Sequence, residues 1–327
     1  MINSLGHKWE LTFTTLVLFG GALFAAFQKF YATSFGGAYW VWMLILFTFI
    51  VQAVSYEYRK KPNNLLGEKT YEIFLFINGS VGVLLIGAAV GTFFTGSNFT
   101  LNEFNQVTWT GPLRGVEAAF SLFNLSLGLF LVFNARTLGA MYLVNNLNFS
   151  QVPELEARIR KACLTSFLIS LPFLLYVLVS LVFMDGFGFD ESGVVSMVPG
   201  KYLANLLGSP IIMILLVAGL FLCILGVTRT GLSTVTTGIW FGGLGTVLVG
   251  LAVFFLAGFN NTPFYPSKAD LQSSLTIYNA SSSHYTLTAM TYVALCIPAV
   301  LAYIFYVWRQ MDSRKIDLQD ISDKKAY

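Results

Sequence analysis

The sequence contains eight apolar stretches, each about as long as a lipid bilayer requires of a spanning helix. They cover residues 11–31, 37–57, 71–94, 116–134, 163–184, 209–228, 239–259 and 286–308. A helix needs about 20 mostly apolar residues to cross the hydrocarbon core. None of the stretches alternates like a barrel strand, so helices must satisfy the backbone polar groups in lipid. We therefore expect an all-α fold, a polytopic transmembrane helix bundle of about eight helices.

Composition supports a membrane protein and excludes several soluble classes. Of the 327 residues, 56% are hydrophobic and only 11% are charged, whereas soluble domains carry about a quarter charged residues. The net charge of +3 is small and dispersed, so we expect no nucleic acid partner. Residues 1–310 read as a single transmembrane helical domain. Residues 311–327 alternate acids with bases and read as a solvated cytoplasmic tail.

Basic residues gather in the segments that would lie on one side of the membrane. By the positive-inside rule these segments are cytoplasmic, which places both ends of this chain in the cytoplasm. Four other basic residues, Lys29, Arg114, Lys201 and Lys268, fall on or near the opposite side. The cytoplasmic set is Lys8, Arg59, Lys60, Lys61, Lys69, Arg136, Arg158, Arg160, Lys161, Arg229, Arg309, Arg314, Lys315, Lys324 and Lys325.

An acidic residue at the start of the first stretch is a candidate for proton transfer. Charge is costly inside a bilayer, so an ionisable group at its edge warrants a functional hypothesis. Glu10 follows Trp9 directly and precedes an apolar face. Its carboxylate could take protons from the cytoplasm and pass them inward. It could equally be an acid that the helix dipole favours at a helix start.

Three other charged positions have structural or interfacial interpretations. Glu117 follows Arg114 by three residues, a spacing that suits a local ion pair or a helix-start acid. Glu57 and Arg59 end the second stretch at the cytoplasmic surface, where we expect them to be interfacial and to contact a partner subunit.

The sequence offers few ligands for a redox centre. Its two histidines, His7 and His284, lie at opposite membrane edges, and Cys163, Cys223 and Cys296 fall in separate apolar stretches. Haem usually takes a His, Met or Cys axial ligand, and structural metal sites need clustered ligands. We therefore expect no haem, no metal and no catalytic centre in this chain.

Two separated runs of residues resemble one known family. Ile2-Asn3-Ser4, Trp9-Glu10 and the run at 20–27, GGALFAAF, are similar to a helix signature of the cytochrome bd quinol oxidase subunit II family. The segment at 273–283, SSLTIYNASSS, is similar to the last outer loop of that family. The two runs occur in the family's order, and the resemblance covers almost the whole chain.

The resemblance implies a subunit of a heterodimeric terminal oxidase in the bacterial inner (cytoplasmic) membrane. Such an oxidase takes electrons from the quinol pool and reduces dioxygen to water. Haem b and haem d would lie in the partner, subunit I. This chain would be haem-free, support assembly and help deliver cytoplasmic protons, with a bound quinone or membrane lipid also expected. The acidic residue after the family's tryptophan belongs to the proton path, which implies that role for Glu10 beside Trp9.

The chain departs from the family pattern in two respects. The family has nine helices, and this sequence begins where the second is expected. We expect the first helix to be missing from this fragment or supplied by a neighbouring chain. Gln52 stands where some relatives carry a basic residue, so we expect no intramembrane charge pair there.

A secondary transporter of small solutes is the alternative from a different functional class. Pro172 and Pro298 lie inside apolar stretches and should kink the helices, and transporters use broken helices near the midplane. Against this alternative, none of the apolar stretches has a charge near its middle. An absorption spectrum distinguishes the two, because only the oxidase would co-purify with haem d.

Overall fold

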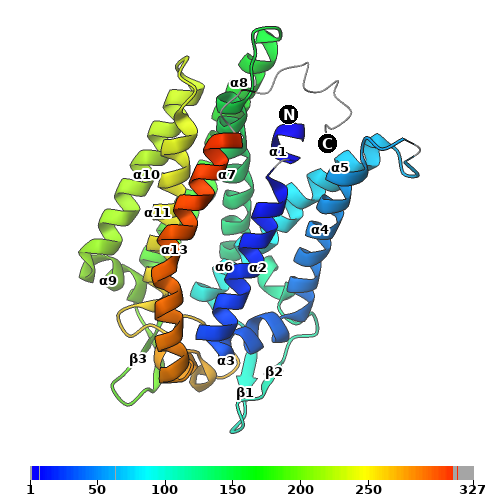
Figure 1. The fold of residues 1–327 in the computed structure, drawn as a ribbon. Helices are drawn as coiled ribbons and strands as arrows, with labels where there is room; N and C mark the ends of the chain where they lie inside the picture. The colour runs from blue at the N-terminus through cyan, green and yellow to red at the C-terminus, as the bar shows by residue number, and fades with distance from the viewer. Residues whose placement is uncertain (1, 7, 63, 312–314, 316–327) are drawn as a thin grey trace.

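The computed structural model describes residues 2–6, 8–62, 64–311 and 315; the side chains of residues 3, 10–13 and 311 lie outside the description. It shows a bundle of long helices that run roughly side by side (Figure 1). These helices are α2 (Trp9–Ala26), α4 (Tyr39–Tyr58), α5 (Glu68–Ile77), α6 (Val83–Thr95), α7 (Leu122–Asn146), α8 (Pro153–Phe183), α10 (Pro210–Gly231), α11 (Gly238–Gly258) and α13 (His284–Met311). The expectation of an all-α transmembrane bundle is confirmed.

Each of the eight expected stretches forms helix. Among the described residues, seven helical segments are long and apolar enough to cross a membrane. One of these, Glu68–Thr95, joins α5 and α6 through a π-helical turn at Asn78–Gly82. The remaining stretch forms α2, whose apolar part Thr14–Ala26 is shorter. After a break at Phe27 it continues as α3 (Gln28–Tyr31) and a π-helical turn at Ala32–Gly37.

Two helix boundaries differ from the sequence prediction. The fourth stretch begins with a 3-10 turn at Val116–Phe120, and α7 then runs to Asn146, well beyond the expected end. Arg136 therefore lies within α7 rather than in the loop after it. Helix α8 starts at Pro153, ten residues earlier than predicted, because proline fits the first helical turn and leaves no donor unpaired there.

The basic segments meet at one end of the bundle. The α4–α5, α7–α8 and α10–α11 connections and the end of α13 all lie at the upper end in Figure 1, with the N-terminal helix α1 (Ile2–Gly6). The charge rule assigns this end to the cytoplasm. At this end Arg160 connects α8 to the end of α10 and to the α10–α11 connection. Its guanidinium donates to the carbonyl oxygens of Thr230, Ser233 and Val235 at 2.6 to 3.2 Å.

The opposite end is closed by short elements in the segments that connect the long helices. They are the hairpins β1 (Phe99–Leu101) with β2 (Val107–Trp109) and β3 (Gly186–Phe189) with β4 (Val195–Val198), and the helices α9 (Lys201–Gly208) and α12 (Ile277–Ala280). The last outer loop bonds to the first hairpin region. Ser97 N–H donates to the Pro266 carbonyl at 2.9 Å, and Leu101 N–H donates to Ser273 Oγ at 2.9 Å.

Glycines bring helix backbones together inside the bundle. A Cβ added at Gly87 on α6 would lie 2.6 Å from the Cα of Gly128 on α7. One added at Gly226 on α10 would lie 2.6 Å from the backbone nitrogen of Gly242 on α11. Small residues permit such approach where lipid supplies no hydrophobic force between helices. Gly87 and Gly242 therefore lie at helix–helix contacts.

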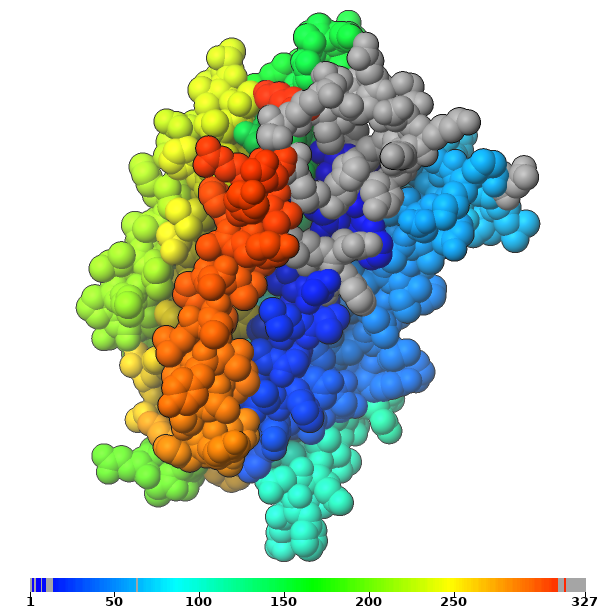
Figure 2. All heavy atoms as spheres, in the orientation of Figure 1, coloured from blue at the N-terminus to red at the C-terminus, as the bar shows by residue number. Residues whose placement is uncertain are grey.

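Helix α13 is the most peripheral span. None of the residues in its apolar window is buried, and it lies along α2 on one face of the molecule (Figure 2). Its exposed side chains are apolar or aromatic along most of its length. Pro298 lies inside this helix, and Pro172 lies inside α8, as predicted.

Glycine-to-alanine substitution should be destabilising where the glycine lies at a close helix–helix contact and harmless where the space at its Cβ is free. Gly87→Ala should lower the free energy of unfolding by about 1–3 kcal/mol, because the added carbon would overlap the α7 backbone. Gly79→Ala, on the same span with nothing within 4 Å of its Cβ, should be neutral or stabilising. Thermal unfolding in detergent measures both, and equal Tm values would contradict the proposed packing of α6 on α7.

Candidate functional site

The predicted proton-path residues lie at the cytoplasmic start of α2. Trp9 is the first residue of that helix and Glu10 the second; the Glu10 side chain lies outside the described part of the structure. The Trp9 ring stacks on that of Tyr56 from α4, with centroids 6.3 Å apart and an interplanar angle of 13°. The indole Nε1 of Trp9 is buried and has no hydrogen-bond partner among the described residues.

A groove opens beside this stacked pair. It has a volume of about 690 Å³ and lies among α2, α4, α7, α11 and α13. Its polar and aromatic lining comprises Lys8, Trp9, Gln52, Tyr56, Tyr142, Trp240 and Trp308; its apolar and small lining comprises Leu5, Ala135, Gly139, Ile239, Gly243 and Leu244. We call it the cytoplasmic groove.

Two interactions order the mouth of the cytoplasmic groove. Lys8 Nζ lies 4.7 Å from the centroid of the Tyr142 ring and 5.0 Å from that of Trp308. Gln52 and Tyr56, one turn apart on α4, are joined by a side-chain hydrogen bond. In the sequence, Gln52 is distinguished only by its lack of charge. The four-residue spacing of Gln52 and Tyr56 was the available sign that both face one side of α4.

Glu57 and Arg59 interact with neighbours in this chain. The guanidinium of Arg59 is buried and donates to Glu68 at 2.7 Å and to Glu72 at 3.1 Å, both on α5. Glu57 pairs with Lys61 one turn further along. The carboxylates of Glu68 and Glu72 are about half exposed. Arg59 thus joins the cytoplasmic ends of α4 and α5, while contact of Glu57 and Arg59 with a partner subunit stays a prediction.

Glu117 lies in the first turn of the 3-10 segment Val116–Phe120, which is the helix-start arrangement, one of the two that the sequence suggested. Its carboxylate accepts hydrogen bonds from the backbone N–H groups of Leu113 and Gly115, both at 2.8 Å. Gly115 has φ +100°, a left-handed conformation that glycine adopts without strain. The acid therefore fixes the turn that leads into α7.

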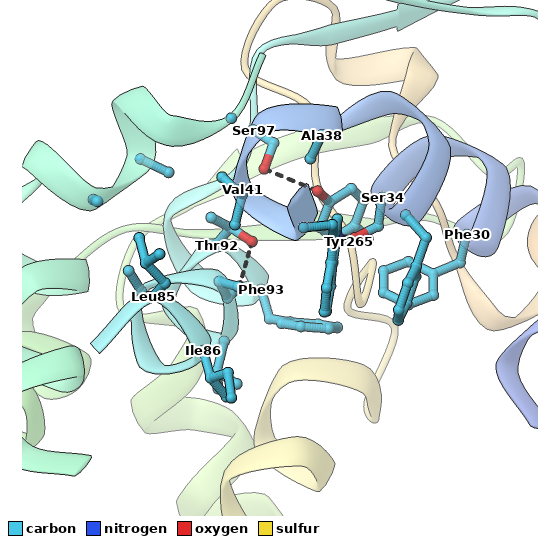
Figure 3. Close-up of a pocket in the computed structure, with 18 of the residues that line it drawn as sticks. Phe30, Ser34, Ala38, Val41, Leu85, Ile86, Thr92, Phe93, Ser97 and Tyr265 are labelled. Carbon is cyan, nitrogen blue, oxygen red and sulfur yellow. Dashed lines mark hydrogen bonds between the residues drawn. The ribbon is translucent and has the colours of Figure 1, made fainter. Parts of the chain in front are cut away.

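A second cavity lies nearer the outer end (Figure 3). It is apolar, with a volume of about 100 Å³, and is walled by aromatic side chains that include Phe30, Phe93 and Trp109. At its polar edge Ser97 Oγ donates to the Tyr265 hydroxyl at 3.3 Å. Burial raises the pKa of Tyr265 above its ordinary value, against the hydrogen bonds of Ser97, Ser34 and Thr92. Ligand pockets usually measure about 300–1,000 Å³, so this cavity is too small for a cofactor ring.

Redox ligands are not gathered anywhere in the described part of the chain. Within it, no three His, Cys, Asp or Glu side chains lie close enough to hold a metal ion. His284 begins α13 at the outer end, and His7 lies outside the described residues. Cys163, Cys223 and Cys296 are free thiols on three different helices.

Comparison with known proteins decides the family. The profile for cytochrome bd terminal oxidase subunit II matches residues 1–311. The chain belongs to the cytochrome bd subunit II family. A relative from Escherichia coli K12, named cytochrome bd-I ubiquinol oxidase subunit 2, is 28% identical over 98% of this chain and 85% of its own length. A probable cytochrome oxidase subunit 2 from Haemophilus influenzae is 27% identical over 96% of this chain and 84% of its own.

The family match covers all the helices described above. The resemblance seen in the two sequence runs is confirmed, and the chain is a multi-pass subunit of a bacterial inner-membrane oxidoreductase complex. A more local match, 29% identical over 29% of this chain, links it to a cytochrome bd ubiquinol oxidase subunit 2 from Bacillus subtilis. Subunit II implies a subunit I partner.

The buried Arg59 should matter more than the exposed pair beside it. Arg59→Gln should lower the free energy of unfolding by about 1–2 kcal/mol, because charge-assisted bonds to Glu68 and Glu72 are lost from a buried site. Lys61→Gln removes an exposed ion pair with Glu57 and should change the Tm little. Thermal unfolding of the two variants under matched conditions tests this, and an Lys61 effect equal to that of Arg59 would contradict it.

Proposed function

We propose that this chain is the haem-free subunit of a cytochrome bd-type oxidase that oxidises quinol and reduces dioxygen to water. The family match over residues 1–311 carries the proposal, and it favours an oxidase subunit over a secondary transporter. In this proposal haem b and haem d belong to subunit I. This chain supports assembly with that partner and supplies no catalytic centre. Quinol reaches the complex from the membrane pool.

The second part of the proposal is that Glu10 relays protons from the cytoplasm. Reduction of dioxygen consumes protons, and protons drawn from the cytoplasm build a gradient without a pump. Glu10 lies one residue beyond Trp9 at the cytoplasmic start of α2, where the cytoplasmic groove opens. A carboxylate at the cytoplasmic start of a membrane helix can accept a proton from water and release it toward the interior of the membrane. The stacking of Trp9 on Tyr56 holds this turn of α2 against α4.

The composition of the purified complex tests the first part. Affinity purification of the tagged chain from membranes should bring down a haem-bearing partner, with haem b and haem d in the absorption spectrum. The expectation follows from the family match over residues 1–311. A colourless preparation that contains this chain alone, from cells expressing the whole complex, would contradict the assignment.

Replacement of the relay carboxylate tests the second part. Glu10→Gln should lower quinol oxidase turnover about tenfold or more, because an amide cannot release a proton, while the complex still assembles. Glu10→Asp should restore much of the rate. Glu57→Gln is the matched control, since it removes another cytoplasmic carboxylate that already has an exposed partner. Oxygen consumption, normalised to haem content, measures all three, and full turnover in Glu10→Gln would remove Glu10 from the mechanism.

A further inference from the structure

The small cavity near the outer end has walls built almost entirely of apolar groups. Its volume is about 100 Å³, and α2, α4 and α6 all contribute side chains to it. Val41, Leu85 and Ile86 supply aliphatic surface beside the rings (Figure 3). We call this cavity the aromatic chamber, after the rings that wall it, among them Phe30, Phe35, Trp42, Phe93, Trp109 and Tyr265.

The polar groups at the edge of the aromatic chamber already have partners within the chain. The indole Nε1 of Trp109 donates to the Thr33 carbonyl at 3.0 Å, and Ser97 Oγ donates to the Tyr265 hydroxyl at 3.3 Å. A buried water molecule needs two to four polar partners, and apolar cavities without such partners stay dry. The chamber therefore favours an apolar occupant over water.

The size of the aromatic chamber restricts that occupant to very small molecules. An apolar cavity of about 150 Å³ in another protein binds benzene or xenon. The chamber, at about 100 Å³, is smaller, so a quinone ring or an acyl chain does not fit. Small apolar gases remain, and each gains dispersion contacts with the surrounding rings.

The aromatic chamber lies close to the surface of the bundle. Phe19 of α2 and Phe254 of α11 both line it, and their side chains are 48% and 42% exposed. One layer of side chains thus separates the chamber from the surroundings of the bundle. Apolar gases dissolve better in hydrocarbon than in water, and exposed side chains change rotamer within picoseconds to nanoseconds. Gas dissolved in the bilayer can enter past these two rings.

We propose that the aromatic chamber binds one molecule of a small apolar gas, which is dioxygen in the working oxidase. The gas site follows from the size, apolarity and position of the chamber. Its assignment to dioxygen rests on the proposed function, because that reaction consumes dioxygen. Binding is non-covalent and requires no electron transfer in this chain.

Xenon tests the gas site directly. Crystals of the intact oxidase complex are pressurised with xenon, and anomalous density should appear in the aromatic chamber. A polar pocket of equal volume, about 100 Å³, lies beside it and is lined by Glu117, Asn124 and Lys268. This pocket is the internal control and should hold no xenon. An excess of dioxygen should displace xenon from the chamber, because the two gases compete for one site.

The volume of the aromatic chamber can be changed in either direction. Ala89→Leu should abolish the xenon density, because Ala89 of α6 lines the chamber and the added carbons fill it. Ala218→Leu is the matched control, since Ala218 of α10 is also partly buried and does not line the chamber. It should bind xenon as the wild type does. Ile86→Ala enlarges the chamber and should raise the xenon occupancy.

Three results would overturn the proposal. They are a chamber that holds no xenon or holds ordered water, xenon retained in Ala89→Leu, and xenon that dioxygen does not displace. Quinol oxidase turnover of the same preparation separates this proposal from the proposed function. An empty chamber in an active oxidase would overturn the gas site alone. Xenon binding in an intact complex without oxidase activity would contradict the proposed function and the assignment to dioxygen, but not the gas site.

Discussion

Close approach of helix backbones across glycine is the constraint on which this bundle depends. Lipid is as apolar as leucine, so burial of apolar side chains gives little net force between helices in a membrane. The α6–α7 contact at Gly87 and Gly128, and the α10–α11 contact at Gly226 and Gly242, leave no room for a methyl group. Dispersion contacts and shape complementarity therefore hold these pairs. Polar residues at these contacts add hydrogen bonds within their own segments: Asn124 Nδ2 donates to the Ala118 carbonyl and Thr246 Oγ1 donates to the Gly242 carbonyl, both at 2.9 Å.

The cytoplasmic groove exists because this close packing is not continuous. On the outer half of α7, α6 packs against Gly128. Toward the cytoplasm α5 diverges from the bundle (Figure 1), and Arg59 fixes the end of α5 to α4 by ion pairs with Glu68 and Glu72. Nearer the cytoplasm, Gly139 of α7 and Gly243 of α11 line the groove, and a Cβ added at either would meet nothing within 4 Å. The open space at Gly139 and Gly243 is part of the groove that Trp9 also lines.

Sequence reasoning predicted the architecture because hydrophobic length is a strong local signal. The eight apolar stretches all became helix. It missed the end of α7 because Arg136 was taken to mark a loop, although a long side chain can reach the interface from within a helix. It missed the outer hairpins because pairs of three- and four-residue strands give almost no periodic pattern.

Of the candidate site, the sequence could predict only those residues that are neighbours along the chain. Trp9 and Glu10 could be proposed because they adjoin in sequence at a helix start, and their role in proton transfer stays a prediction. Tyr142 and Trp308 come from helices far along the chain, and no spacing rule places them beside Lys8. The pairing of Arg59 with Glu68 and Glu72 was missed for a related reason, since α4 and α5 had to be folded against each other before the carboxylates had a position.

The outer cap has a consequence for biogenesis. Residues 97–101, exported early in synthesis, leave backbone groups that are satisfied only by Pro266 and Ser273, which emerge about 170 residues later. Translocation delivers segments in order from the amino end. These backbone groups of the first hairpin therefore lack these partners until α11 has crossed the membrane and the loop that follows it has been exported. A nascent chain arrested before that point would display an open outer face, the form that quality-control proteases in that compartment would meet.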